Sequence, residues 1–183
     1  MDSEEVYWNN FMVLFIDRMV RSMRKDISDK IADLEISGPQ APYVLSLYIK
    51  DYQSMASLSN FLEMDRANTS RVIRSLELKG LVVSERRTGS SRNVPVMLTS
   101  YGRKVAEKLF ERVVDINKSF FEGIPEMDVV RFKNTVIRVF RNIYGIDGGA
   151  DSESFYKELG VESVLSPRSL TTCGTSSRKL GNL

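Results

Sequence analysis

The chain has no histidine and a single cysteine, Cys173, among its 183 residues. Without histidine there is no zinc site built on histidine and no catalytic triad with a histidine base. A lone cysteine cannot form an internal disulfide, and nothing in the composition suggests a secreted domain. Carboxylate sites for hard cations stay open, but no clustered acidic loop marks one. We therefore expect no enzyme activity, no bound metal and no cofactor.

Long hydrophobic runs are missing as well. The most apolar stretch, residues 11–16, is far shorter than the roughly 20 residues of a membrane-spanning helix, and charged residues follow it closely. The chain opens with the acidic stretch 1–5, which is the opposite of a signal peptide. We expect a cytoplasmic protein that does not enter the membrane.

Proline and glycine are absent up to Ser37, so a helix can run without interruption from about Glu5 to Ile36. Its apolar residues recur at spacings of three and four: Trp8, Phe11, Met12, Phe15, Met19, Met23, Ile27, Ile31 and Leu34. Core packing is the common use of such a methionine-rich stripe, and a ligand pocket is the alternative.

Two further amphipathic helices are expected after residue 100. One follows Ser100 as its N-cap and covers about 101–121, and the other covers about 126–144. The remaining chain is rich in Gly, Ser and Thr, which indicates a linker and a tail. Cys173 lies in this tail, where an idle surface thiol is a simpler interpretation than a redox sensor.

Residues 54–99 show a different pattern. A short helix over about 55–62 is followed by a turn, and Asp65 is well placed to cap a second helix. Gly80 sits where a left-handed residue ends a helix. The apolar stripe of the second helix consists of Thr69, Val72, Ile73 and Leu76. Its opposite face consists of Arg66, Asn68, Ser70, Arg71 and Arg74.

Two strand-like stretches, 81–87 and 94–99, flank a turn over 88–93. With a preceding helix over about 43–49, the segment has the pattern of a winged helix-turn-helix, whose exposed second-helix face suits the DNA major groove. The fold class expected is therefore mainly α with a small β-wing. Long N- and C-terminal helices flank this domain, and they carry more apolar surface than it can cover, which predicts dimerisation.

The charge is unevenly spread along the chain. Residues 54–103 contain eight basic and four acidic side chains, a local excess of four positive charges, whereas acids outnumber bases in residues 1–36. A basic module suits a DNA binder, because phosphate neutralisation supplies much of the affinity. Charge alone is equally compatible with a solvated helix face, and the winged-helix pattern favours DNA.

Several of these segments together resemble the multiple-antibiotic-resistance regulator (MarR) family. They are Leu58-Ser59 to Leu62, Asp65-Arg66, Leu76-Glu77-Leu78-Lys79-Gly80-Leu81-Val82 and Leu98-Thr99-Ser100-Tyr101-Gly102-Arg103. The resemblance covers roughly residues 5–144. Similar proteins often carry Asp-x-Arg at the wing tip, whereas this chain has Ser90 in the aspartate position and keeps Arg92. A carboxylate there would hold the arginine by a charge-assisted bond, so its loss predicts a looser wing.

The resemblance implies a transcription regulator, a repressor, whose first and last helices intertwine with those of a second copy. The expected partners are double-stranded DNA with a palindromic site, a second copy of the chain and a small aromatic effector. The residues expected at DNA are Arg66, Asn68, Ser70, Arg71 and Arg74 on the helix and Arg86, Arg87 and Arg92 on the wing. Those expected at the effector are Trp8, Tyr43 and Tyr48, with half-buried packing as the alternative.

We expect four regions in the chain. They are an N-terminal dimerisation helix (1–36), a winged helix-turn-helix DNA-binding domain (37–100), C-terminal dimerisation helices (101–145) and a linker with a tail (146–183). The alternative function is a winged-helix module that binds protein instead of DNA. Such a module would expose apolar residues on its second helix, where this sequence places Arg, Asn and Ser.

Overall fold

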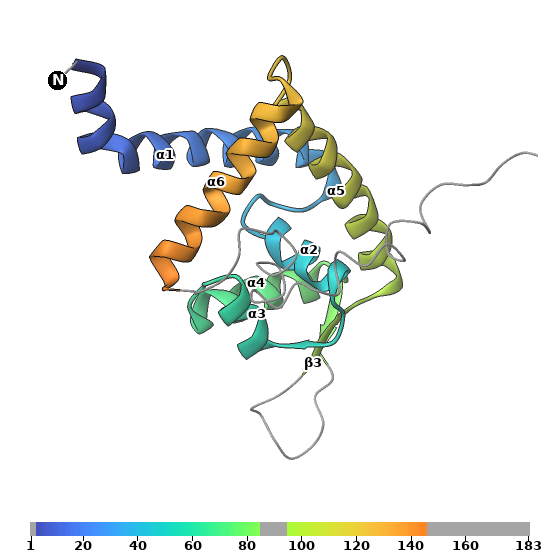
Figure 1. Cartoon of the computed structure of the whole chain (residues 1–183). Coiled ribbons are helices and arrows are strands. Elements are labelled where there is room, and N and C mark those ends of the chain that lie inside the picture. Colours follow the sequence, from blue (N-terminus) through green and yellow to red (C-terminus); the bar gives the residue numbers. More distant parts are fainter. Residues whose placement is uncertain (1–2, 85–94, 146–183) are drawn as a thin grey trace, which may run out of the picture. The chain divides into compact units, whose positions relative to one another are not determined.

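The computed structural model describes residues 3–84 and 95–145 (Figure 1). Its helices are α1 (Ser3–Lys30), α2 (Ala41–Ile49), α3 (Met55–Phe61), α4 (Arg66–Leu78), α5 (Ser100–Ser119) and α6 (Glu126–Tyr144), with a 3-10 turn η1 (Ala32–Leu34). Its strands are β1 (Gln53–Ser54), β2 (Val82–Ser84) and β3 (Pro95–Leu98). The mainly helical class with a small antiparallel sheet is confirmed. No helix among the described residues has the length and hydropathy to cross a membrane.

The chain forms two compact units that divide between Glu122 and Gly123. The first unit holds the winged helix-turn-helix, α1 and α5. Its core gathers side chains from α2, α3, α4, α5 and the sheet, and from the residue that follows α1: Ile31, Tyr43, Val44, Leu47, Leu58, Ile73, Leu76, Leu81, Val96, Ala106 and Leu109. The second unit contributes α6, whose bounds agree with the predicted helix over 126–144.

The first helix is shorter than the sequence pattern predicts. It ends at Lys30, and η1 follows instead of a continuous helix to Ile36. Ile31, Leu34 and Ile36 are all buried in the winged-helix core, so the chain has to turn inward here. A 3-10 turn keeps the spacing of three between Ile31 and Leu34, which is why the apolar pattern looked unbroken.

The sheet has three strands in the order β1-β3-β2, one more than the predicted ribbon. Val83 pairs with Met97 across β2 and β3, as the two predicted strands require. On its other edge β3 pairs antiparallel with β1, where Gln53 lies opposite Val96. A two-residue strand has too little alternation to be seen in the sequence. The predicted turn over 88–93 lies outside the described residues.

The start of α5 explains the Leu98–Arg103 segment in physical terms. Thr99, and not the predicted Ser100, is the N-cap: its Oγ1 accepts the amide of Gly102 at 2.9 Å and donates to the carbonyl of Gly80 at 2.7 Å. Thr99 has the extended backbone of a cap residue, because it still follows β3. Gly102 lies so close to Leu81 that a Cβ would come within 1.8 Å of the Leu81 carbonyl oxygen.

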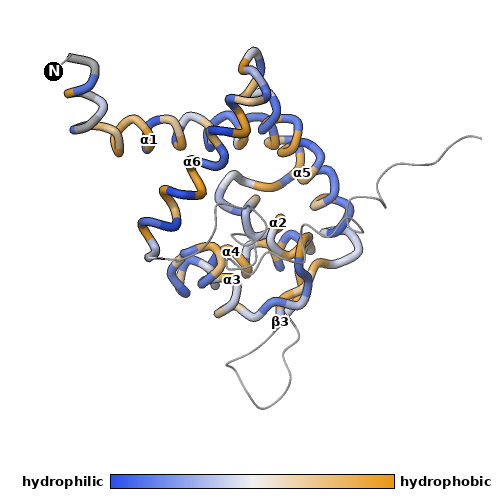
Figure 2. The backbone as a smooth tube through the Cα atoms, in the orientation of Figure 1, coloured by the Kyte–Doolittle hydropathy of each residue, from blue (hydrophilic) through white to orange (hydrophobic). Residues whose placement is uncertain are grey.

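The N-terminal half of α1 leaves large apolar side chains exposed, and Figure 2 shows the corresponding hydrophobic stretch. Val13 is 72% exposed and Trp8 is 55% exposed. The exposed set consists of Trp8, Phe11, Met12, Val13, Leu14, Phe15, Ile16 and Met19. Such a surface is unusual for an isolated soluble unit and suits an interface.

Candidate nucleic-acid interface

The turn between α3 and α4 is held by reciprocal hydrogen bonds between its two ends. The Ser59 hydroxyl donates to the carbonyl of Met64 at 2.6 Å, and the Met64 amide donates to the carbonyl of Ser59 at 2.9 Å. Glu63 takes a positive φ of 51° to make the turn this tight. Asp65 then caps α4 as predicted, since its carboxylate accepts the Asn68 amide at 2.7 Å. The start of α4 is therefore fixed relative to α3.

The predicted apolar stripe of α4 faces the core. Thr69, Ile73 and Leu76 are completely buried, and Val72 is partly buried. The Thr69 hydroxyl is hydrogen-bonded to the Tyr43 hydroxyl of α2 at 3.2 Å, which satisfies two polar groups inside the core. Because this face of α4 is fixed in the core, it determines which side chains of α4 point outward.

The outward face of α4 carries the residues that the sequence predicts at DNA. Arg66, Ser70, Arg71 and Arg74 are exposed, and Asn68 is half-buried. Within residues 3–84 and 95–145, none of the three arginines forms a salt bridge. Arg71 has a local contact, a hydrogen bond from its Nε to the carbonyl of Ala67 at 3.3 Å. Guanidinium groups with this freedom can bind phosphates or guanine edges.

One exposed residue on this face was missed. Leu78 ends α4 and is 84% exposed, and the helical spacing puts it on the stripe of Arg71 and Arg74. Leu78 was not predicted to face outward, because an apolar residue near a helix end usually packs inward. Apart from the small Ala67, Leu78 is the one apolar side chain exposed on this face of α4 among the described residues.

The C-terminal end of α4 is tied to the segment that joins α1 to α2. Lys79 Nζ donates to the Glu35 carbonyl at 2.6 Å and to Gln40 Oε1 at 2.8 Å. Gln40 is buried and donates from Nε2 to the Ser75 hydroxyl at 2.9 Å. No local pattern reveals this network, because each of these hydrogen bonds joins residues that are 35 or more positions apart.

The wing arginines Arg86, Arg87 and Arg92 and the substituted position Ser90 lie outside the described residues. The last described residue of the outgoing strand, Ser84, is hydrogen-bonded through its hydroxyl to the carboxylate of Glu77 on α4. The base of the wing is thereby joined to α4.

The three aromatic residues predicted at an effector have separate surroundings. Tyr43 is buried in the winged-helix core, and Tyr48 packs against Phe110 with 5.6 Å between ring centroids. Trp8 stacks on Phe15 of its own helix at 6.4 Å. In Figure 1 the N-terminal half of α1 extends away from α2. The packing alternative describes Tyr43 better than a ligand contact.

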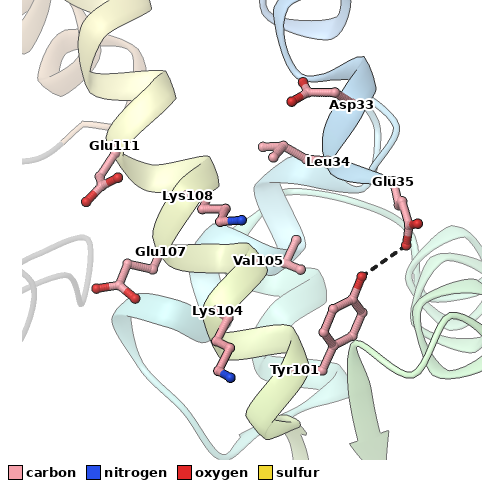
Figure 3. Close-up of a pocket in the computed structure, with 9 residues that line it drawn as sticks. All are labelled: Asp33, Leu34, Glu35, Tyr101, Lys104, Val105, Glu107, Lys108 and Glu111. Atoms are coloured by element: carbon pink, nitrogen blue, oxygen red, sulfur yellow. Dashed lines mark hydrogen bonds between the residues drawn. The ribbon is translucent and has the colours of Figure 1, made fainter.

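A pocket of about 520 Å³ lies instead between η1 and one face of α5 (Figure 3). It is lined by Asp33, Leu34, Glu35, Tyr101, Lys104, Val105, Glu107, Lys108 and Glu111. Sequence reasoning missed it because its charged lining resembles two ordinary solvated helix faces.

Two side-chain contacts organise the rim of this pocket. The Tyr101 hydroxyl donates to Glu35 Oε2 at 3.1 Å, and this hydrogen bond to a carboxylate raises the pKa of Tyr101 above its usual value. Arg112 forms an ion pair with Asp33 and donates to the Lys30 carbonyl at 3.0 Å. The hydrogen bond from Arg112 lowers the pKa of the Asp33 carboxyl below its usual value.

Comparisons with known proteins agree with this geometry. The MarR family model matches residues 36–94, from η1's end through the wing. A solved MarR transcriptional regulator from Methanosarcina mazei Go1 is 25% identical, with a TM-score of 0.67 over 80% of this chain and 94% of that one. A MarR-family regulator from Silicibacter pomeroyi is 22% identical, with a TM-score of 0.63 over 78% of this chain and 97% of that one.

A third solved structure was obtained with a ligand. CouR from Rhodococcus jostii RHA1, bound to p-coumaroyl-CoA, is 19% identical, with a TM-score of 0.59 over 70% of this chain and 90% of that one. At this identity the likeness concerns the fold alone. No match was found among curated proteins. Residues 36–94 therefore match the MarR family model, and the described fold is that of solved MarR-family transcriptional regulators.

Proposed function

We propose that the chain is a sequence-specific DNA-binding transcription regulator that acts as a repressor. The observation that carries this proposal is the outward face of α4, where Arg66, Arg71 and Arg74 are exposed and form no salt bridge with a described residue. The helix beneath them is capped at Asp65 and anchored by its buried stripe. A rigid helix with free guanidinium groups is what major-groove recognition requires.

Within this proposal each residue has a distinct task. Asn68, Ser70, Arg71 and Arg74 face the major groove, where the arginines can read guanine and Asn68 can read adenine. Arg66, at the N-terminal end of α4, lies nearer the phosphates. On the wing, Arg92 approaches the minor groove, and Arg86 or Arg87 binds the backbone.

The working form is a homodimer, and the exposed apolar residues of α1 support this part of the proposal. Two-fold pairing would cover them and would set two copies of α4 about one DNA turn apart, roughly 34–36 Å. The DNA site would then be a palindrome or near-palindrome. The predicted division into regions 1–36, 37–100, 101–145 and 146–183 rests on the same assembly.

Control by a small aromatic effector is a separate part of the proposal and needs its own experiment. The pocket between η1 and α5 is large enough for such a molecule, and CouR is a structural neighbour solved with an aromatic thioester. An effector must bind one arrangement of the α4 helices better than another, or it shifts nothing. A panel of phenolic and aromatic acids titrated against DNA-bound protein tests this, and no change in DNA affinity would contradict it.

The alternative function, a winged-helix module that binds protein, is favoured by one observation only. Leu78 places an apolar side chain at the end of the α4 face. Apart from the small Ala67, the other exposed positions of α4 are charged or polar, which suits DNA better than a protein core.

In vitro selection of the bound DNA sequence, followed by comparison of Arg71→Ala with wild type, tests the proposal. We expect the variant to lose about 1–3 kcal/mol of discrimination between the selected site and a mismatched site. Arg24→Ala removes the same charge from an exposed position on α1 and is the matched control. Equal losses on selected and random DNA would contradict base readout by Arg71, and failure to select any sequence would favour the protein-binding alternative.

A further inference from the structure

The segment between η1 and α2 contacts both α4 and α5 through one residue, Glu35. Its main-chain carbonyl accepts Lys79 Nζ from the end of α4 at 2.6 Å. Its side-chain carboxylate accepts the Tyr101 hydroxyl from α5 at 3.1 Å, as Figure 3 shows. The two helices are therefore connected through opposite ends of a single residue.

The backbone of Glu35 is in an unusual conformation. Its φ of 58° and ψ of 15° lie in the left-handed region, which residues with a Cβ rarely adopt without support from their surroundings. The two hydrogen bonds described above supply such support. Loss of either bond should let Glu35 move toward a more ordinary conformation and should release the other contact.

A second contact holds the last turn of α4 at more than one point. Lys79 Nζ also donates to Gln40 Oε1 at 2.8 Å, and the buried Gln40 donates to Ser75 one turn earlier in α4. Lys79 and Ser75 thus fix the last turn of α4 against the segment 35–40. The first turn, with the DNA-facing residues, lies at the other end of a helix about 20 Å long.

We propose that Glu35 is a joint that couples the position of Tyr101 to the orientation of α4, and that Lys79 is the positioning residue on the α4 side. The proposal rests on the proposed DNA-binding function for its consequence, but the joint itself is a property of the free protein. A tilt of about 5° at the anchored end would move the far end of α4 by nearly 2 Å. That displacement is enough to misplace a bidentate arginine contact.

The joint also gives the pocket a route to DNA. Tyr101 lines the pocket and its hydroxyl points to Glu35 (Figure 3). A molecule that enters the pocket and takes the Tyr101 hydroxyl as a hydrogen-bond partner would remove one support of Glu35. The effect would reach α4 through Lys79 without any contact between the molecule and α4.

Amide hydrogen exchange on the DNA-free full chain tests the joint directly. Lys79→Met keeps the aliphatic stem and removes the donor, and Tyr101→Phe removes a single exposed oxygen. We expect both variants to speed exchange in the last turn of α4 by about two- to thirtyfold. Lys50→Met and Tyr52→Phe change an exposed lysine and an exposed tyrosine outside the joint and are the matched controls.

The two changes should also be non-additive. Because both act through Glu35, the double variant should exchange more slowly than the product of the single effects predicts. Unchanged exchange in Tyr101→Phe would overturn the joint even if Lys79→Met did not fold. Fully multiplicative effects would overturn it as well, because they would mean that the two bonds are independent.

DNA binding then tests the positioning role of Lys79. With a duplex recovered by in vitro selection, Lys79→Met should weaken binding about tenfold, while its binding to a random duplex should weaken no more than that of Lys50→Met. Equal losses on both duplexes, with the salt slope reduced by about one, would make Lys79 a phosphate contact and overturn the role. If wild type selects no duplex, the DNA function fails, and hydrogen exchange alone still decides the joint.

Discussion

Helices α1 and α4 expose opposite kinds of side chain. The outer face of α4 carries Arg66, Ser70, Arg71 and Arg74, which water solvates well. The N-terminal half of α1 exposes apolar residues on more than one side, because Phe11, Val13 and Leu14 cannot share a single face. Each buried Å² of such a surface is worth roughly 25 cal/mol. The outer face of α4 is stable in contact with water, whereas covering the apolar surface of α1 lowers the free energy of the protein.

The same contrast separates the winged-helix core from α6. Core residues such as Leu47, Leu58 and Ile73 are completely buried within the first unit. Taken by itself, α6 exposes apolar side chains at the helical spacing that the sequence predicts: Phe132, Val136, Val139 and Ile143. The winged-helix core therefore buries its own apolar side chains, whereas α6 leaves much of its apolar stripe exposed, as the proposed dimer would require.

The largest effect should follow from adding charge to the exposed apolar stretch of α1, so that it resembles the charged outer face of α4. Phe15→Glu places a charge in the middle of the exposed apolar stretch. Fully burying a Phe is worth about 1.5–3 kcal/mol, and Phe15 is 50% exposed, so covering the rest is worth about half of that in each of the two copies. Each new carboxylate would also have to be desolvated, so the dissociation constant should rise by at least about two orders of magnitude. Sedimentation velocity over a concentration series measures the change, and wild-type thermal stability should rise with protein concentration.

Ser22→Glu adds the same charge to an exposed polar position of α1 and should leave the assembly unchanged. A wild-type chain that sediments as a monomer at micromolar concentration and still unfolds cooperatively would contradict the dimer. The proposed binding to two half-sites would then fail, because a monomer carries only one α4.

A smaller effect, limited to the packing of α5 against the winged-helix core, is expected from Gly102→Ala. The new Cβ would lie 1.8 Å from the Leu81 carbonyl oxygen, and this neighbour is backbone that cannot rotate away. The first turn of α5 must then move away from Leu81, the residue before β2. We expect a loss of about 1–3 kcal/mol in the free energy of unfolding, measured by chemical denaturation.

Ser100→Ala, two positions earlier and exposed, is the control for the change to alanine. Because the new contact is made with Leu81, at the winged-helix end of α5, and not in the exposed apolar stretch of α1, the variant should keep the sedimentation behaviour of wild type at temperatures where it is folded. A stability equal to that of wild type would mean that α5 can shift freely, contrary to the close packing described here.

The part of the fold with local signals was predictable from the sequence. Asp65 caps α4 and Gly80 ends it with a positive φ, because both features depend on neighbours within a few residues. The bounds of α6 were also predicted, since the glycine and proline before it leave little choice. The exposed arginines of α4 followed from helical periodicity alone.

The features that were wrong or missed depend on residues far apart in the chain. The early end of α1 follows from the core that Ile31 and Leu34 enter, and the capping role of Thr99 follows from its position after β3. The pocket and the Glu35 contacts bring residues 33–35 together with α5, which no local pattern reveals. Whether Arg71 reads DNA, and what the wing arginines do, stays a prediction.

The smallest effect should come from Asp33, at the junction where α1 gives way to the winged-helix core. Its ion pair with Arg112 lowers the pKa of the carboxyl, so the pair stabilises the folded chain above the unfolded pKa of about 3.9 and this contribution is lost as pH falls through the lowered folded value. Asp33→Asn should therefore lower stability slightly at pH 7 and make less difference near pH 3, as measured by denaturant unfolding at both values. Asp29→Asn changes an exposed carboxylate that forms no ion pair with a described residue and should show no such trend. Because Asp33 and Arg112 are partly exposed, the effect at pH 7 should shrink in high salt. An Asp33→Asn difference that is the same at both pH values would mean that the pair does not hold this junction.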